Sequence, residues 1–365
     1  MMSLFYSILG FLVVVLVTVS VHEFGHFYIA RLCGVKVDVF SIGFGKAFYR
    51  WIDKYGTEFR ICTVPLGGYV KMFGDKNIVS APDFEAFQDM NEEEKRISFY
   101  HKPLWKKACI VAAGPAFNYL LAIVLMSLLF SVYGKVSTTN QISHIAEKSI
   151  ASYLGLLPGD TIISINNRTI NDVLDIKNSI ASARSILDLK IEIMRDGQKQ
   201  IYDVKEIIDR SGVNYNTIDH SMLGVNFLAN RKEVNLLESV LASISDAITI
   251  SFAMLEGLVS IIIHDHSASD LGGPIKIAQY SGESLKLGLA PMIWFVAMIS
   301  LNLGLVNLLP IPMLDGGHLL YYLIESVTGR SISQKMQKFC GHLGFFILIA
   351  LMLFATFNDI RGLIR

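Results

Sequence analysis

The chain has 365 residues, of which 52% are hydrophobic and only 18% charged. A mean hydropathy of +0.46 is too high for an ordinary soluble protein and indicates an integral membrane protein. Basic and acidic residues balance at 32 each, so nothing in the charge favours a nucleic-acid partner. The four cysteines form no CxxC pair, which indicates neither a disulfide framework nor a cysteine metal site.

The first predicted element is a membrane-spanning helix. Residues 4–21 (LFYSILGFLVVVLVTVSV) carry no charge and are long enough to cross a bilayer as a helix. No basic segment precedes this helix, and removing the helix would also remove the two histidines at its end. We therefore expect a retained helix rather than a cleaved signal peptide.

The HEFGH motif at residues 22–26 continues this helix. His22 and His26 are four residues apart and lie on one helix face, which is the spacing that two imidazoles need to share a metal ion. Glu23 is then placed to take a proton from the attacking water. Ionisable residues near lipid are costly, so their presence here favours a functional site over a chance match.

A basic loop follows the first helix. Residues 31–76 carry eight lysines and arginines, which predicts a cytoplasmic loop and an N-terminus outside. Within this loop, residues 57–72 partly alternate between polar and apolar side chains around a Pro-Leu-Gly-Gly segment at 65–68. This pattern predicts a β-hairpin or β-loop.

A second apolar stretch, at about residues 110–133, is predicted to return the chain outward. It opens with the motif AGPAFN at residues 113–118, whose small residues permit close helix contact. Pro115 removes a backbone hydrogen bond, so we expect a kink there.

Residues 135–232 predict a separate soluble domain of short strands and a helix. Residues 187–195 alternate cleanly, and Asp196-Gly197 supplies a hairpin turn after them. Residues 151–180 resemble a PDZ domain of the bacterial protease type, a module that binds extended peptides at a sheet edge. A generic small α+β domain is the alternative.

Two histidines leave a catalytic zinc ion short of its usual third protein ligand. Asp315 is the candidate, because it follows the apolar residues 289–309 in a turn rich in proline and glycine. A helix cap is the alternative role. If residues 135–232 lie outside, the 289–309 helix runs inward and delivers Asp315 to the depth of the histidines. This argument requires residues 236–263, which contain three acidic residues, to form an interfacial or re-entrant helix rather than a crossing.

Five sequence motifs follow one another along nearly the whole chain, at residues 22–26 (HEFGH), 65–72 (PLGGYVKM), 114–118 (GPAFN), 272–275 (GGPI) and 302–318 (NLGLVNLLPIPMLDGGH). Together they resemble the motifs of the site-2 protease family of intramembrane zinc metalloproteases, and closely those of its bacterial RseP (regulator of sigma-E protease) type. One departure is that residues 135–232 leave room for a single PDZ domain, whereas the best-known members of this type carry two.

The resemblance implies that His22, His26 and Asp315 hold one zinc ion per chain. It also implies that Glu23 is the general base and that Asn307 contacts the substrate backbone. The chain is accordingly expected to be an intramembrane zinc metalloprotease.

The resemblance further implies that residues 65–72 form a membrane-inserted β-loop. Gly67, Gly68 and Tyr69 of this loop would bind substrate by pairing with an unwound substrate strand. The expected substrates are transmembrane segments of single-pass membrane proteins. Regulated intramembrane proteolysis of an anti-sigma factor and removal of remnant signal peptides both fit, and an upstream site-1-type protease is an expected partner besides the lipid bilayer.

The expected fold is an α-helical polytopic membrane protein with about four transmembrane helices, the membrane-inserted β-loop and an inserted α+β PDZ domain. The last apolar run, about 343–357, supplies the fourth helix. The expected location is the bacterial inner membrane, with the N-terminus and PDZ domain extracytoplasmic and the active site toward the cytoplasm. The expected divisions are an N-terminal membrane core at 1–134, the PDZ-like domain at 135–232, a connector with the interfacial or re-entrant helix at 233–288 and a C-terminal membrane core at 289–365.

Two other functions are weighed against the protease. A non-catalytic PDZ-containing membrane receptor or chaperone would not need the intact set of histidines, glutamate and aspartate. A transporter would show repeated halves, and the sequence has none. Among the remaining polar residues, residues 264–266 (HDH) are more typical of a solvated loop than of a second metal site. His318 could support the metal ligands or cap a helix, and Asn118 and Asn302 could hydrogen-bond between helices.

Overall fold

The computed structural model describes residues 2–364 except 76–89, 148, 172, 182, 184, 212–222, 264–271 and 331. The chain forms two compact units, one of Met1–Val132 with Asn235–Arg365 and one of Tyr133–Val234. We call them the helical unit and the sheet unit and describe each by itself. Residues 264–266 (HDH), which are interpreted from the sequence as a solvated loop, lie outside the described residues.

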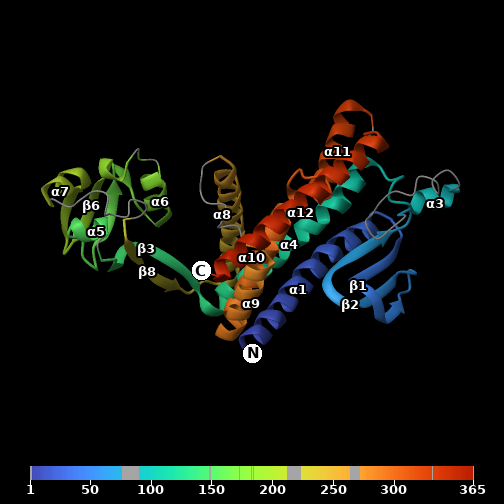
Figure 1. Ribbon diagram of the computed structural model, residues 1–365, viewed down its shortest axis with the longest axis horizontal. Helices are drawn as coiled ribbons and strands as arrows, with labels where there is room; N and C mark the ends of the chain where they lie inside the picture. Colours follow the sequence, from blue (N-terminus) through green and yellow to red (C-terminus); the bar gives the residue numbers. More distant parts are fainter. Residues whose placement is uncertain are drawn as a thin grey trace. The chain divides into compact units, whose positions relative to one another are not determined.

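The helical unit is built from long apolar helices (Figure 1). Among the described residues, five helices are long and apolar enough to cross a membrane. One of them is α8, a single continuous helix in the segment predicted to be interfacial or re-entrant. Because its path relative to the membrane is not shown, the count of four crossings stays a prediction. The helices of this unit are α1 (Met2–Leu32), α3 (Glu92–Ile97), α4 (Leu104–Tyr133), α8 (Leu236–Ile263), α9 (Pro274–Leu287), α10 (Leu289–Leu308), α11 (Asp315–Thr328) and α12 (Gln334–Ile364).

Helix α9 lies antiparallel along the N-terminal half of α1 (Figure 1). The two backbones touch, because a Cβ atom added to Gly10 would lie 2.6 Å from the carbonyl oxygen of Ser281. Farther along α9, the Nζ atom of Lys286 donates to the Oγ atom of Ser3 over 3.1 Å. Later residues of α9 therefore contact earlier residues of α1, so the two helices run in opposite directions.

This arrangement changes the topological argument for Asp315. Because α9 brings the chain back to the end where α1 begins, α10 starts there whichever path α8 takes. Val14 of α1 packs against Met292 and Val296 of α10, so α10 runs parallel to α1 toward the HEFGH motif. The approach of Asp315 to the histidines therefore does not depend on whether residues 236–263 cross the membrane, and their interfacial or re-entrant path stays a prediction.

Two strands form a bent sheet beside α1. β1 (Val37–Ile52) pairs with two separate parts of β2 (Glu58–Met72), so that Ser41 faces Arg60 on one side and Tyr69 on the other. Residues 68–72 thus form an outer edge, and no other described strand pairs with them.

An aromatic core fixes this sheet against the second half of α1. The ring of Phe27 lies 5.3 Å from that of Phe40 and 5.5 Å from that of Phe59, both edge-on. Val70 of β2 and Ile110 of α4 belong to the same buried cluster. Because Phe27 directly follows the HEFGH motif, this packing fixes the β2 edge beside the motif.

The sheet unit has an antiparallel sheet with strand order β7-β6-β4-β3-β8 around an isoleucine-rich core. Asp196 and Gly197, with φ of 50° and 79°, form the two-residue turn between β6 and β7, which confirms the predicted hairpin. Strand β8 occupies one edge of the sheet. The elements are β3 (Lys135–Ile145), α5 (Ile150–Tyr153), β4 (Thr161–Ile165), β5 (Arg168–Thr169), α6 (Val173–Ala181), β6 (Lys190–Arg195), β7 (Gln198–Asp203), α7 (Val204–Ser211) and β8 (Val225–Lys232).

Candidate metal centre

Helix α4 makes one polar contact to each of the two histidines of α1. The Nδ1 atom of His26 lies 2.8 Å from the backbone oxygen of Ile110, and the Nδ1 atom of His22 lies 3.2 Å from the side-chain amide of Asn118. Midway between these contacts is Gly114, where an added Cβ atom would lie 2.3 Å from the Nε2 atom of His26. The glycine of the GPAFN motif is therefore required to admit the imidazoles.

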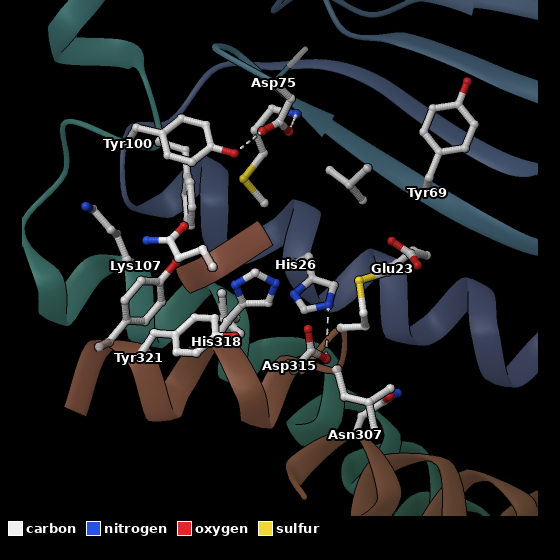
Figure 2. A pocket seen from close by; sticks show the side chains of 18 of the residues that line it. Glu23, His26, Tyr69, Asp75, Tyr100, Lys107, Asn307, Asp315, His318 and Tyr321 are labelled. Atoms are coloured by element: carbon white, nitrogen blue, oxygen red, sulfur yellow. Dashed lines mark hydrogen bonds and ion pairs between the residues drawn. The ribbon is translucent and has the colours of Figure 1, made fainter. Parts of the chain in front are cut away.

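Asp315 reaches the histidines from the distant end of the chain (Figure 2). Its Oδ2 atom lies 3.2 Å from the Nε2 atom of His22 and 3.5 Å from that of His26. Asp315 is the first residue of α11, and Leu314 caps this helix without a side-chain hydrogen bond. The carboxylate thus faces the imidazoles.

The turn before Asp315 is unusually tight. Met313 adopts a left-handed backbone conformation, with φ of 80°. A Cβ atom added to Gly316 would lie 2.2 Å from the backbone oxygen of Leu309, and one added to Gly317 would lie 2.5 Å from that of Ile311. The two glycines after Asp315 are needed because α11 starts against the chain that leaves α10.

The three side chains fit a zinc ion. One donor atom from each of His22, His26 and Asp315 lies within 4.8 Å of the others. The Oδ2 atom of Asp315 is buried and makes no hydrogen bond of good geometry, although both imidazoles are close to it. Two imidazole nitrogens and one carboxylate oxygen form a known protein ligand set for catalytic zinc.

Glu23 lies between this donor set and the edge of β2. An added Cβ atom at Gly68 would lie 3.3 Å from the Cγ atom of Glu23, and the backbone amide of Val70 lies close enough to the Glu23 carboxylate to interact with its charge. The β2 edge and the carboxylate are therefore in direct contact.

A cavity of about 790 Å³ joins these groups. His22, Glu23, His26 and Asp315 line it together with three predicted substrate-binding residues, Asn307, Gly68 and Tyr69. Gly67 is not among the lining residues, because the ring of Phe44 covers it at 2.5 Å from an added Cβ atom. At φ of 139°, Gly67 instead permits a backbone turn that other residues rarely adopt.

The cavity continues past the histidines to a polar region (Figure 2). There the Asp75 carboxylate accepts hydrogen bonds from the Tyr100 hydroxyl, at 2.8 Å, and from the Met72 amide, at 2.9 Å. Burial raises the pKa of Asp75 to about 6, although both hydrogen bonds oppose the rise. Lys107 and Glu325 line the same region.

Sequence reasoning did not find the contact of Asn118 with His22. The only available signal was its spacing, since residues 110, 114 and 118 share one face of α4. His318 lines the cavity beside His26, whereas Asn302 is exposed on α10 (Figure 2).

The fold and the site together define a helical membrane protein with a candidate three-ligand zinc centre. More specifically, the chain belongs to peptidase family M50, whose family model matches residues 10–351. A proposed zinc metalloprotease of Rhizobium meliloti is 36% identical over 372 aligned residues, which cover 99% of this chain and 98% of that protein. A proposed zinc metalloprotease of Campylobacter jejuni is 37% identical over an alignment that covers 99% of this chain and 95% of that protein. The metalloprotease MmpA of Caulobacter vibrioides is 30% identical over an alignment that covers 99% of this chain and 97% of that protein.

Family membership makes the protein a zinc-dependent metalloprotease. The five apolar helices agree with a multi-pass membrane protein.

Proposed function

We propose that the protein is an intramembrane endopeptidase of the site-2 type, similar to RseP, that cleaves transmembrane segments of single-pass membrane proteins. The observation that carries this proposal is the position of the HEFGH motif within an apolar helix of 31 residues, with Asp315 3.2 Å from His22. A soluble peptide would have no access to such a site without entering the membrane.

In this proposal His22, His26 and Asp315 hold the zinc ion, and Glu23 is the general base. Bound zinc supplies a Lewis acid that activates water and stabilises the oxyanion of amide hydrolysis. Glu23 accepts the proton of the attacking water and passes it to the leaving nitrogen. The contact of Glu23 with the β2 edge supports this role, because a substrate strand on that edge would lie next to the carboxylate.

The β2 edge also offers a solution to the unwinding problem. A transmembrane substrate hides its carbonyl groups in helical hydrogen bonds, and each unpaired backbone group in lipid costs several kcal/mol. No described strand other than β1 pairs with residues 68–72, whose outer edge lines the cavity, and the Met72 amide at the end of this edge already bonds the Asp75 carboxylate. We propose that the unwound substrate pairs there, with Asn307 contacting its backbone across the cavity.

The sheet unit is proposed to be a single PDZ-like domain outside the membrane. Its edge strand β8 is the element to which an extended peptide would add. We propose the bacterial inner membrane as the location, with prior trimming of the substrate by a site-1-type protease. The substrates fitting this scheme are anti-sigma factors and remnant signal peptides.

Replacement of Glu23 tests the proposal. Purified Glu23→Gln should keep one zinc ion per chain and lose cleavage of a model transmembrane substrate, because only the proton acceptor is removed. Glu256→Gln, the same substitution at an exposed position of α8, should keep both. Cleavage that survives Glu23→Gln would refute the assigned base.

A further inference from the structure

The α4 helix makes one contact to each histidine, and the two contacts differ in kind. His26 faces the backbone oxygen of Ile110, which can only accept a hydrogen bond. The Nδ1 atom of His26 must therefore carry the proton. Its Nε2 atom is left unprotonated and faces Asp315. The backbone alone selects the tautomer that can bind a metal.

His22 faces a group that can either donate or accept. The nearest atom of Asn118 to the Nδ1 atom of His22 is Nδ2, at 3.2 Å, while the Oδ1 atom of Asn118 is buried without a hydrogen-bond partner. Amide nitrogen and oxygen exchange places when the group turns over, so this orientation is one of two. In the orientation present, the buried oxygen makes no hydrogen bond, so no partner of its own opposes the turn and the contact with His22 decides between the two orientations.

The two orientations have opposite consequences for the metal. If Asn118 donates its amide proton, the Nδ1 atom of His22 is unprotonated and its Nε2 atom carries the proton. That proton prevents Nε2 from coordinating a metal ion. If Asn118 accepts through Oδ1, the Nδ1 atom carries the proton and Nε2 is bare. The Nε2 atoms of His22 and His26, only 3.2 Å apart, then both face Asp315 as ligands.

We propose that Asn118 is a positioning residue whose side-chain oxygen accepts the Nδ1 proton of His22 and thereby holds this imidazole as a zinc ligand. This inference rests on the zinc-ligand assignment of the proposed function. It gives the asparagine of the GPAFN motif a role matched to that of the Ile110 carbonyl, eight residues earlier on the same face of α4.

A second contact holds Asn118 in register with the other half of the site. The Oγ atom of Ser300 donates to the backbone oxygen of Asn118 over 2.8 Å, and both residues are fully buried. Ser300 belongs to α10, the helix that leads to Asp315. Asn118 is thus fixed both to the helix that carries His22 and to the helix that delivers Asp315.

Zinc affinity, measured by chelator competition on the purified full-length protein, tests this role without reference to proteolysis. Asn118→Leu keeps the branched shape of the side chain but removes the acceptor, and it should weaken zinc binding by about 10- to 100-fold. Asn118→Asp keeps an acceptor and should bind zinc at least as well as the wild type. Ser127→Ala, at another buried polar position of α4, should bind zinc normally.

Zinc affinity in Asn118→Leu equal to wild type would overturn the proposal, as would equal losses in the leucine and aspartate variants. If the leucine variant does not fold, Asn118→Ala compared with Asn118→Asp gives the same test. Failure of the proposed function is distinguishable, because it would appear as normal zinc binding without cleavage of transmembrane substrates, or as zinc retained by His22→Ala.

Discussion

The Nε2 atom of His22 and the Oδ2 atom of Asp315 lie 3.2 Å apart, although the two residues stand near opposite ends of the chain. The contact exists because α10 runs parallel to α1 and ends at the depth of the HEFGH motif. The tight turn of residues 309–314 then points Asp315 back at the histidines. The candidate site is therefore assembled by the packing of the helical unit rather than by any local segment.

Proline at Tyr69 should strongly reduce the cleavage rate while leaving the zinc content unchanged. Proline cannot donate a backbone hydrogen bond and would disrupt the β2 edge on which the substrate is proposed to pair. We expect at least about a tenfold loss of cleavage rate, because one lost backbone interaction of about 1.4 kcal/mol suffices for that. Tyr69→Phe keeps the backbone and should retain activity. Loss of zinc from Tyr69→Pro would contradict a substrate-binding role for this edge.

The effect of a substitution at Met313 should depend on whether the new residue tolerates the left-handed backbone conformation, rather than on the size of its side chain. Its φ of 80° is accessible to glycine but is strained for a β-branched residue. Met313→Val should lower the free energy of unfolding by about 1–3 kcal/mol and weaken zinc binding, whereas Met313→Gly should preserve both. Thermal unfolding and zinc titration measure these effects. Met352→Val, on the exposed face of α12, is the control and should be close to neutral.

Asp75 should make stability depend on pH in an identifiable window. Burial raises its pKa from 3.8 to about 6, so the folded state disfavours the charged carboxylate. Well below pH 4 the group is neutral in both states and costs nothing. The folding penalty builds as the pH rises from about 4 to about 6, because the unfolded state ionises first, and it reaches about 3 kcal/mol above about pH 7.

The comparison that isolates this effect is the unfolding temperature of the wild type minus that of Asp75→Asn, measured from pH 4 to pH 8. We expect the difference to shift against the wild type as the pH rises and to level off above pH 7. A constant difference would show that Asp75 is not held in the buried environment described here.

Asp359 should be important for stability because it caps α9 from α12. Its carboxylate accepts hydrogen bonds from the amides of Gly273 (2.9 Å), Ile275 (3.0 Å) and Lys276 (3.1 Å), and only 2% of the residue is exposed. Asp359→Ala should cost about 2 kcal/mol, at the upper end for a helix cap, since the amides are left without this acceptor. Asp359→Asn should lose less. Equal unfolding temperatures for the two variants would argue against capping.

The half of the site on α1 was predictable from the sequence alone. The four-residue spacing of His22 and His26 fixes their common face on any helix, so no tertiary information is needed. Asp315 was found by counting membrane crossings, whereas in the structure the packing of α9 and α10 along α1 brings it to the histidines. The sequence gives little sign of α9, because its 14 residues include Lys276, Glu283 and Lys286 and are too short for a hydropathy signal.

The remaining features depend on packing that no local pattern encodes. Residues 37–52 pair with two parts of β2, and this places the free edge at residues 68–72 rather than elsewhere in the sheet. Asn118 was predicted to hydrogen-bond between helices, but the residue it contacts was not predicted. Its role as the partner of His22 required the register of α4 against α1.

The central claim is that residue 315 and the HEFGH histidines bind the same metal ion. The most direct test is the absorption spectrum of cobalt-substituted Asp315→Cys, recorded against cobalt-substituted wild type to account for the four native cysteines. A thiolate on cobalt gives a charge-transfer band in the near ultraviolet that a carboxylate does not. The account predicts one new thiolate–cobalt band per bound metal. Stoichiometric cobalt binding without that band would contradict it.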